Sequence, residues 1–497
     1  MVYEQIEGLI QQAVKAELIE TADIRYIRNQ VIHLLRLEIF PETVENPAVD
    51  TIPNILESII SYAIEQGVIE DVFDEKEILA ANIMNCFIAR PSVINETFYE
   101  KYKTSPEQAT DYFYNLSKHS NYIQMNRIAK NISFKAKSSY GELDITINLS
   151  KPEKDPEQIK REQTMKRDLN YPKCLLCAEN EGYAGRTGYP ARANHRIIKV
   201  PLLEDNWYLQ YSPYVYYNEH SILLSEEHRD MMIDRDAFER LLTFTDKFPH
   251  YFIGSNADLP IVGGSILSHD HYQAGRYEFA MMKAADAFPF QLDDFPEVAA
   301  SVVKWPMSVI RLKGGKIADL VNAADHVLTT WRNYSDPDAD IIAFTGDTPH
   351  NTITPIATFR GGEFELYLVL RNNRTSKEHP LGIFHPHADV HHIKKENIGL
   401  IEVMGLAVLP PRLIDELHEI QNSLLRKTSK LPEHHKSWAH QLQEKYHHLS
   451  NEKEAEEILK EELGQKFVKI LEDAGVIKER IAFERFIDTL NKQVTNE

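Results

Sequence analysis

The sequence predicts an α+β protein in which an N-terminal helical domain precedes a duplicated unit of antiparallel strands and helices. Three observations support this class. Apolar residues recur at helical spacing through the first 130 residues, and period-two alternation begins near residue 132. Short strands followed by closely spaced histidines then occur twice, around residues 269 and 385. We therefore place domains at 1–130, 131–304, 305–430 and 431–497.

The first domain shows helical spacing in four stretches and contains few glycines, which favours a bundle of helices. These stretches are residues 6–18, 24–35, 55–69 and 78–88. Cys86 lies in the fourth stretch among Ile83, Met84 and Phe87. Such surroundings are typical of a buried structural thiol rather than a reactive one.

The pattern changes at Ile132, where residues 133–136 and 143–148 alternate around the turn Tyr140-Gly141-Glu142. This is the signature of a β-hairpin. A charged stretch, 151–167, follows and is expected to form a loop and a solvated helix. Its Lys151 and Lys154 are better explained as surface charge than as phosphate contacts.

Two series of short strands with interleaved helices fill the middle of the chain. In the first we expect strands at 196–200, 207–211, 221–225 and 251–254, with a helix at 236–248. In the second we expect a strand at 308–312, a helix at 318–334, a hairpin of 353–360 with 364–371, and a long helix at 397–409 before Pro410-Pro411. Residues 450–495 are predicted to be highly charged helix.

The composition is ordinary for a soluble globular protein, with 43% hydrophobic and 26% charged residues. No run approaches about 18 uninterrupted apolar residues, so no membrane span is expected, and the N-terminus lacks the pattern of a secretory signal. Three cysteines in 497 residues do not make a disulfide framework, which indicates a reducing cytoplasm. The net charge of −20 argues against nucleic acid as a partner, although a local cationic pocket can bind a small anion.

Residues 263–273, Gly-Gly-Ser-Ile-Leu-Ser-His-Asp-His-Tyr-Gln, are the stretch best suited to catalysis. If the segment leaves its glycine turn as a strand, His269, His271 and Gln273 point to one face. Backbone N–H groups at Gly263 and Gly264 could receive phosphate oxygens there. The pattern favours phosphoryl chemistry on a histidine, while a histidine pair in a strand can also be a polar surface pair or half of a metal site.

Cys174-Leu175-Leu176-Cys177 is a C-x-x-C motif, which is compatible with redox chemistry or with zinc. A turn-rich stretch follows it instead of the helix that a thioredoxin-like motif would precede. Zinc requires four ligands, commonly thiolates and imidazoles, and the chain has no second C-x-x-C. His228, at the end of a predicted strand, and His269 would complete a tetrahedral set. A purely structural role without metal is the alternative.

A second group of imidazoles comprises His385, His387, His391 and His392, with His379 nearby. The sequence leaves three explanations open for this group: another divalent metal site, a polar strand that faces phosphate, and exposed surface residues.

Three segments together resemble the galactose-1-phosphate uridylyltransferase family of the histidine-triad-like superfamily, and its longer bacterial class II branch in particular. They are residues 171–177, Tyr-Pro-Lys-Cys-Leu-Leu-Cys; residues 268–275, Ser-His-Asp-His-Tyr-Gln-Ala-Gly; and residues 385–392, His-Pro-His-Ala-Asp-Val-His-His. The resemblance covers most of the chain and implies a fold of duplicated histidine-triad-like antiparallel sheet units. Asp270 stands where the better-known branch has proline, and the helical N-terminal third has no counterpart there.

The resemblance implies roles for individual residues. The nucleophile of the family falls on His271 and the glutamine of its H-x-H-x-Q motif on Gln273. The zinc ligands fall on Cys174, Cys177, His228 and His269. The phosphate and ribose are expected near Asn256, Gly263, Gly264, Ser265 and Ser268.

The implied reaction moves UMP between UDP-glucose and galactose-1-phosphate by double displacement through a uridylyl-histidine, in a cytoplasmic homodimer. A neutral imidazole is a competent nucleophile and leaving group near pH 7. Glutamine, unlike the third histidine of hydrolase relatives, can donate a hydrogen bond but no proton. Two alternatives remain: a nucleotidyltransferase or phosphorylase acting on ADP- or GDP-linked substrates, and a non-catalytic, zinc-stabilised nucleotide-binding module.

Overall fold

The computed structural model describes residues 2–150, 170–264, 266–447, 449 and 451–492. The charged stretch 151–167, with Lys151 and Lys154, lies outside the described residues, as does Ser265. The chain divides into two compact units. The first comprises Met1–Lys130, Ser150–Val215 and Glu219–His228, and the second comprises Asn131–Leu149, Tyr216–Asn218 and Arg229–Glu497. Each unit is described by itself below.

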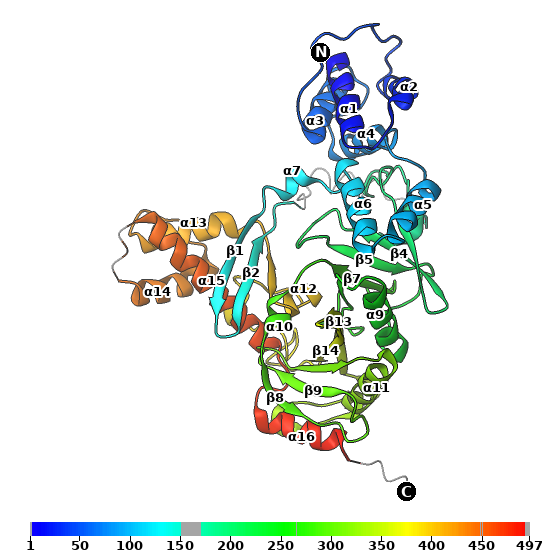
Figure 1. Ribbon diagram of the computed structural model, residues 1–497. Helices are drawn as coiled ribbons and strands as arrows, with labels where there is room; N and C mark the ends of the chain where they lie inside the picture. Colours follow the sequence, from blue (N-terminus) through cyan, green and yellow to red (C-terminus); the bar gives the residue numbers. More distant parts are fainter. Residues whose placement is uncertain (1, 151–169, 265, 448, 450, 493–497) are drawn as a thin grey trace. The chain divides into compact units, whose positions relative to one another are not determined.

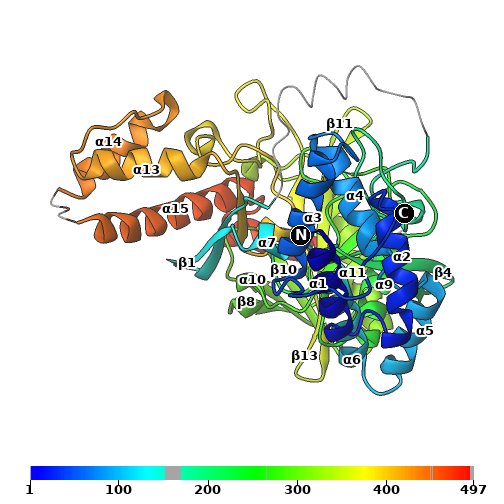
Figure 2. The same cartoon turned by 90° about the horizontal axis from the view of Figure 1, so that it is seen from above.

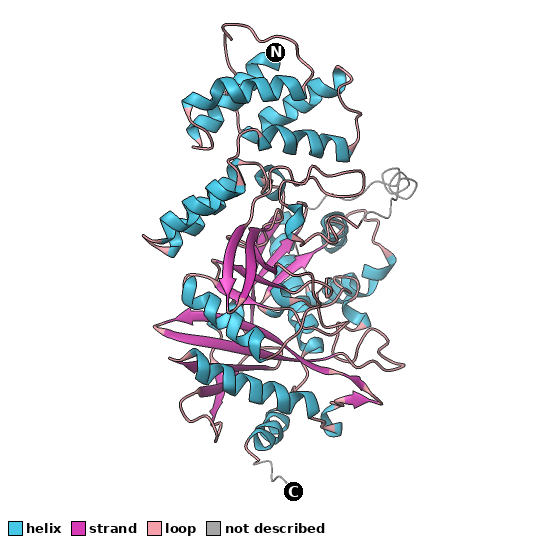
Figure 3. Cartoon of the chain, turned by 90° about the vertical axis from the view of Figure 1, so that its right-hand side faces the viewer, coloured by secondary structure: helices cyan, strands magenta, loops and turns pink. Residues whose placement is uncertain are grey.

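The first 130 residues are helical, as the apolar spacing predicts (Figure 1). The helices are α1 (Val2–Lys15), α2 (Ile24–Leu34), α3 (Ile52–Glu65), α4 (Phe73–Asn85), α5 (Pro91–Tyr102), α6 (Pro106–His119) and α7 (Met125–Ile128). The first four share one apolar core, in which Ile6, Ile55 and Ile83 are fully buried. Figure 3 shows this group of helices without strands between them. Burial of one apolar stripe per helix is what holds such a group together.

The rest of the first unit contains an antiparallel three-strand arrangement, β3 (Ile198–Leu202), β4 (Asp205–Tyr211) and β5 (Ser221–Ser225), close to the predicted bounds. Helix α5 packs on β3. The amide of Asn95 donates to the Ile197 carbonyl at 3.0 Å and its oxygen accepts from the Lys199 N–H at 2.8 Å. The segment with the two cysteines precedes β3 and contains the short 3-10 helix η2 (Ala178–Asn180).

The second unit is built on antiparallel strands in the order β7-β6-β13-β14-β10-β9-β8. They are β6 (Phe252–Gly254), β7 (His271–Gly275), β8 (Asp286–Phe290), β9 (Ala299–Val303), β10 (Val309–Gly314), β13 (Asn351–Arg360) and β14 (Glu363–Asn372). Helices α9 (Arg235–Lys247) and α11 (Ile317–Asn333) contact each other and pack on these strands (Figure 1). The predicted hairpin across Gly361-Gly362 is confirmed. The sequence did not reveal β8 and β9.

A smaller sheet of β1 (Ile132–Ser138), β2 (Gly141–Ile147) and β15 (Leu406–Leu409) also belongs to the second unit. The predicted hairpin of β1 and β2 is confirmed. Helix α15 (Glu452–Ala474) packs on β1. Gly464 permits this close approach, because a Cβ there would meet the side chain of Ala136.

The predicted long helix at 397–409 is wrong. Only α12 (Leu400–Val403) is helical, and β15 pairs in parallel with β2. Gly405 ends the helix with a φ of 103°, a conformation that favours glycine, and the ring of Trp305 occupies the space beside it. The short apolar run Leu406–Leu409 is compatible with a buried strand as well as with a buried helix, so periodicity alone could not distinguish the two.

The remaining elements belong to the second unit. They are α10 (Ala280–Lys283), β11 (Phe344–Thr345), β12 (Thr348–Pro349), α13 (Leu413–Leu424), α14 (Lys436–Lys445), α16 (Arg480–Leu490), and the 3-10 helices η3 (Pro337–Ala339), η4 (Ala388–Val390) and η5 (Glu433–His435); η1 (Thr21–Asp23) lies in the first. Helices α13, α14 and α15 lie side by side (Figures 1 and 2). Within the described residues no helix has the length and apolarity that crossing a membrane requires.

The α+β class with an N-terminal helical domain is thus confirmed. The charged C-terminal region is helical as predicted, although Gly475 follows the end of α15 and α16 begins at Arg480. The boundaries at residues 304 and 430, and with them the duplication, remain a prediction.

Candidate active site and metal centre

His271 is the first residue of β7, and its imidazole is held by the backbone. Its Nδ1 lies 2.7 Å from the carbonyl oxygen of His269, so Nδ1–H donates and Nε2 keeps its lone pair. The residue is only 7% exposed. Burial lowers the pKa of His271 to about 4, so the ring is neutral at pH 7. A neutral imidazole in one tautomer is the form that a nucleophile needs.

Gln273 lies two residues along the same strand and therefore on the same face as His271. Its backbone pairs with Gly254 of β6. The side-chain Oε1 is buried without a hydrogen-bond partner among the described residues. The predicted strand begins later than expected: His269 lies in a bend before β7, so only His271 and Gln273 share the strand face.

The glycine turn before the histidines is explained in part by packing. A Cβ on Gly263 would lie 2.5 Å from the Ala257 carbonyl oxygen, and one on Gly264 would lie 2.8 Å from Nδ2 of Asn256. The Asn256 side chain is itself buried, and its Oδ1 accepts from the Leu400 N–H at 2.9 Å. Ser268 is exposed in the bend before β7. The turn thus needs glycine for close approach, and its role in phosphate binding stays a prediction.

We expect Gly263→Ala to lower the free energy of unfolding by about 1–3 kcal/mol, because the added methyl meets backbone oxygen that cannot rotate away. Gly315→Ala is the matched control, since that glycine is exposed and nothing lies within 4 Å of its Cβ position. Urea unfolding of both variants measures the difference. Equal stability of the two would contradict the packing explanation.

Asp270, between the two histidines, lies in a cationic setting that the sequence did not reveal. Its Oδ2 lies 3.4 Å from Nε of Arg229, and the carboxyl is buried. Burial raises the pKa of Asp270 to about 6, against the effect of Arg229 and Arg240. Arg240 donates to the Tyr272 hydroxyl at 3.4 Å. Asp270 itself, an acidic residue between two histidines, was the sequence signal that could have indicated nearby arginine side chains.

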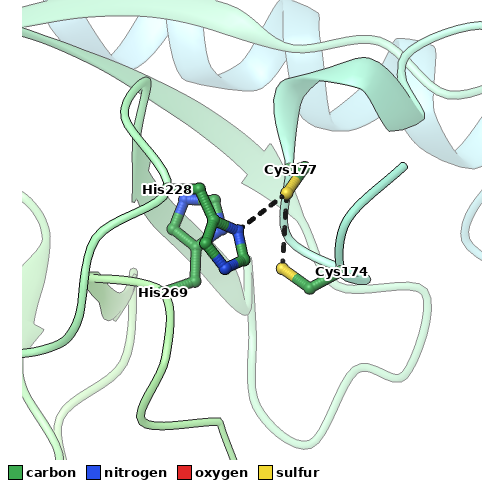
Figure 4. Close-up of side chains that lie close together, drawn as sticks. All are labelled: Cys174, Cys177, His228 and His269. Carbon is green, nitrogen blue, oxygen red and sulfur yellow. Dashed lines mark hydrogen bonds between the residues drawn. The ribbon is translucent and has the colours of Figure 1, made fainter. Parts of the chain in front are cut away.

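Cys174, Cys177, His228 and His269 come together as the zinc prediction requires (Figure 4). One potential ligand atom from each lies within 4.8 Å of the others. The two sulfurs are 3.5 Å apart, and Sγ of Cys177 lies 3.1 Å from Nδ1 of His228. In Figure 4 both imidazole rings lie close to the sulfurs. Asn180 fixes the cysteine turn by donating to the carbonyls of Cys174 and Cys177, each at 2.8 Å.

This donor set fits zinc. Two thiols and two imidazoles are a common structural zinc set, in which sulfur binds as thiolate. Burial raises the pKa of Cys177 to about 12, so this sulfur would hold its proton at pH 7 without a cation. A divalent ion would displace this proton and bind the sulfur as a thiolate. Both cysteines are free thiols.

The second group of histidines does not form a comparable set. Ring nitrogens of His385, His387 and His391 bond to backbone carbonyls at 3.3, 3.0 and 2.8 Å. The ring of His387 stacks on that of His379, with centroids 4.3 Å apart. The segment contains η4 and no strand, so the polar-strand explanation is wrong. Within the described residues, neither group of closely spaced potential ligands includes any of these histidines.

Comparison with known families and proteins gives a consistent result. Residues 17–230 match the family model described as galactose-1-phosphate uridyl transferase, N-terminal domain, and residues 243–440 match that of its C-terminal domain. The chain belongs to the galactose-1-phosphate uridyl transferase family. The resemblance inferred from the three motifs is confirmed, and with it the assignment to an enzyme family of nucleotidyltransferases.

Relatives extend the match over nearly the whole chain. A galactose-1-phosphate uridylyltransferase of Clostridium perfringens (strain 13 / Type A) is 51% identical over 492 residues, covering 98% of both chains. One of Halalkalibacterium halodurans is 52% identical over 503 residues, again 98% of both. Among solved structures, yeast Ap4A phosphorylase Apa2 is similar with a TM-score of 0.35 and 11% identity, covering 64% of this chain and 90% of that one.

Proposed function

We propose that this protein exchanges UMP between UDP-glucose and galactose-1-phosphate, with Nε2 of His271 as the nucleophile. The observation that carries the proposal is the bond from Nδ1 of His271 to the His269 carbonyl, which leaves Nε2 as the nucleophilic nitrogen of a neutral, buried ring. The names of relatives about half identical over the full length support the choice of substrates.

The reaction runs in two displacements. In the first, Nε2 attacks the α-phosphorus of UDP-glucose; a P–N bond forms, and the bond from that phosphorus to the bridging oxygen breaks, releasing glucose-1-phosphate. In the second, a phosphate oxygen of galactose-1-phosphate attacks the same phosphorus; the P–N bond breaks, and UDP-galactose leaves. No proton has to be supplied in either step: glucose-1-phosphate leaves the first displacement as a stable anion, and His271, which keeps its Nδ1 proton, leaves the second as a neutral imidazole. Burial of His271 lowers its basicity and so helps it to leave in the second step.

In this proposal Gln273 stabilises the transferring phosphoryl group, a role supported by its position two residues after His271 on the same strand face. Its amide N–H can donate to a phosphoryl oxygen without protonating a leaving group. We expect Gln273→Ala to lower kcat by about 10²–10³-fold, the usual effect of removing one preorganised donor. Steady-state kinetics with both substrates measures this. Gln273→Glu, which has the same length but lacks the amide N–H, should be impaired at least as strongly; wild-type kcat in either variant would remove Gln273 from this role.

Covalent labelling tests the proposal directly. The protein is mixed with UDP-glucose labelled in the uracil ring and passed through a denaturing gel-filtration column. Label that stays with the protein, is released by acid and survives alkali identifies a phosphoramidate. Absence of covalent label, or initial-rate kinetics that require both substrates bound before product leaves, would overturn the mechanism. Parallel assays with ADP-glucose and GDP-glucose test the choice of base.

We further propose a structural zinc ion held by Cys174, Cys177, His228 and His269, supported by the fit of this donor set. Zinc would contribute by joining the segments that carry its ligands, and the His269 carbonyl would keep its bond to His271. Elemental analysis of the purified protein tests it.

The remaining parts of the proposal are small-molecule substrates without nucleic acid, a homodimer, and a cytoplasmic location. Light scattering of the purified protein tests the dimer.

A further inference from the structure

A second group of potential metal ligands lies far along the chain from the active-site motifs. It comprises Glu416 on α13 with His434 and His435 in η5, and one ligand atom of each lies within 4.8 Å of the others. Nε2 of His434 lies 3.2 Å from Oε1 of Glu416, and Nε2 of His435 lies 2.9 Å from Oε2. We propose that these three side chains bind a divalent transition-metal ion, with zinc as the probe of choice.

The fold brings the three ligands together through a helical hairpin. Glu416 lies in the first turn of α13, and the chain returns through residues 425–432 to η5 and directly into α14. The hairpin is fixed independently of the three ligands, because α13 contacts both α14 and α15 and Gln443 donates to the Ser423 hydroxyl at 2.8 Å. Figures 1 and 2 show these helices side by side. The ligands are therefore held by secondary structure on both sides.

The donor set is the kind that borderline divalent ions prefer. Two imidazole nitrogens and one carboxylate occur in zinc and non-haem iron sites, and oxygen-preferring ions such as magnesium do not favour them. His435 is fully buried, with its ring 5.2 Å from that of His392 and 6.1 Å from that of Trp438, so its orientation is restricted.

Arg412 limits how tightly an ion would bind. Its Nη1 lies 2.5 Å from Oε2 of Glu416, and the same nitrogen donates to the His392 carbonyl at 3.1 Å. The guanidinium neutralises part of the carboxylate charge before any metal arrives. Arg412 contacts Oε2 of Glu416, whereas Oε1 faces His434, so the carboxylate can bind both the guanidinium and a metal ion. We therefore expect binding weaker than that of the thiolate set.

Metal counting on the full-length protein tests the inference. Wild type and variants are stripped with a chelator, saturated with zinc, desalted and analysed for metal and protein. Wild type is expected to hold about one zinc per chain more than His434→Ala or Glu416→Gln, because each removes one of three ligands. The matched control is His440→Ala on α14, whose exposed imidazole lies 3.6 Å from Glu444 and belongs to neither group of potential ligands among the described residues. This variant should hold as much zinc as wild type.

The readout is the difference between wild type and variant, so it does not depend on the cysteine set or on uridylyl transfer. His434 is partly exposed, and its removal should leave the helical circular dichroism unchanged. Equal zinc content in wild type, His434→Ala and Glu416→Gln would overturn the inference and leave the three residues as an ion-paired cluster with Arg412. A loss in His440→Ala equal to that in His434→Ala would also overturn it, since the binding would then be non-specific.

Discussion

His271→Ala is expected to abolish uridylyl transfer and covalent labelling together. In the proposed mechanism, the substitution removes the nitrogen that carries the uridylyl group between the two displacements. Loss of a covalent nucleophile lowers turnover on the order of 10⁴-fold or more. The variant should still fold, although the buried His269 carbonyl loses its hydrogen bond from Nδ1 at a cost of about 1–3 kcal/mol. Initial rates, covalent label and a urea unfolding curve are measured on the same preparation.

His271→Asn separates chemistry from structure at this position. The asparagine amide N–H can occupy the place of Nδ1–H and donate to the His269 carbonyl, but it provides no nucleophilic nitrogen. We expect stability closer to that of wild type than in His271→Ala, with equally complete loss of labelling. A variant that keeps its label with either substitution would mean that the nucleotide is attached elsewhere.

The strand with His271 and Gln273, which belongs to the candidate active site, could be predicted from sequence because its signals are local. Histidine and glutamine two residues apart share a strand face wherever the strand lies in the sheet. The sequence could not reveal that His269 lies before the strand, since the bend there is fixed by long-range contacts such as the Met231 N–H bond to the Leu267 carbonyl at 2.8 Å. The carbonyl of His269 reaches Nδ1 of His271 from that bend.

Other parts of the fold depend on partners distant in sequence. Residues 406–409 form a strand because they pair in parallel with the edge of β2, which lies more than 250 residues earlier in the chain. Asn256 was expected near the phosphate and ribose, which stays a prediction; the sequence did not reveal that its Oδ1 accepts from the Leu400 N–H. Glu416 and His434 are 18 positions apart, and only the hairpin of α13 and α14 places them side by side. Periodicity and local motifs contain no information on such pairings.

Removal of zinc is expected to produce the largest loss of stability. When free zinc is about a thousandfold above its Kd, an ion that binds the folded but not the unfolded chain adds about 4 kcal/mol to the free energy of unfolding. This contribution disappears when the metal is removed. Cys177→Ser should lower zinc content by about one per chain and lower Tm, because a buried serine hydroxyl is a far poorer zinc ligand than a thiolate. Calorimetry with and without chelator, combined with metal analysis, measures both effects.

Cys86→Ser provides the matched control for this prediction. Its thiol lies at the end of α4 outside the ligand set, donates to the Asn82 carbonyl at 3.4 Å, and has a pKa that burial raises to about 11. A serine hydroxyl can keep that bond, so zinc content and the response to chelator should match those of wild type. If Cys177 is a zinc ligand, chelator should no longer remove zinc from this site or lower Tm through it in Cys177→Ser. In Cys86→Ser, chelator should still do both. Chelator sensitivity that is equal in both variants would show that Cys177 does not hold the ion.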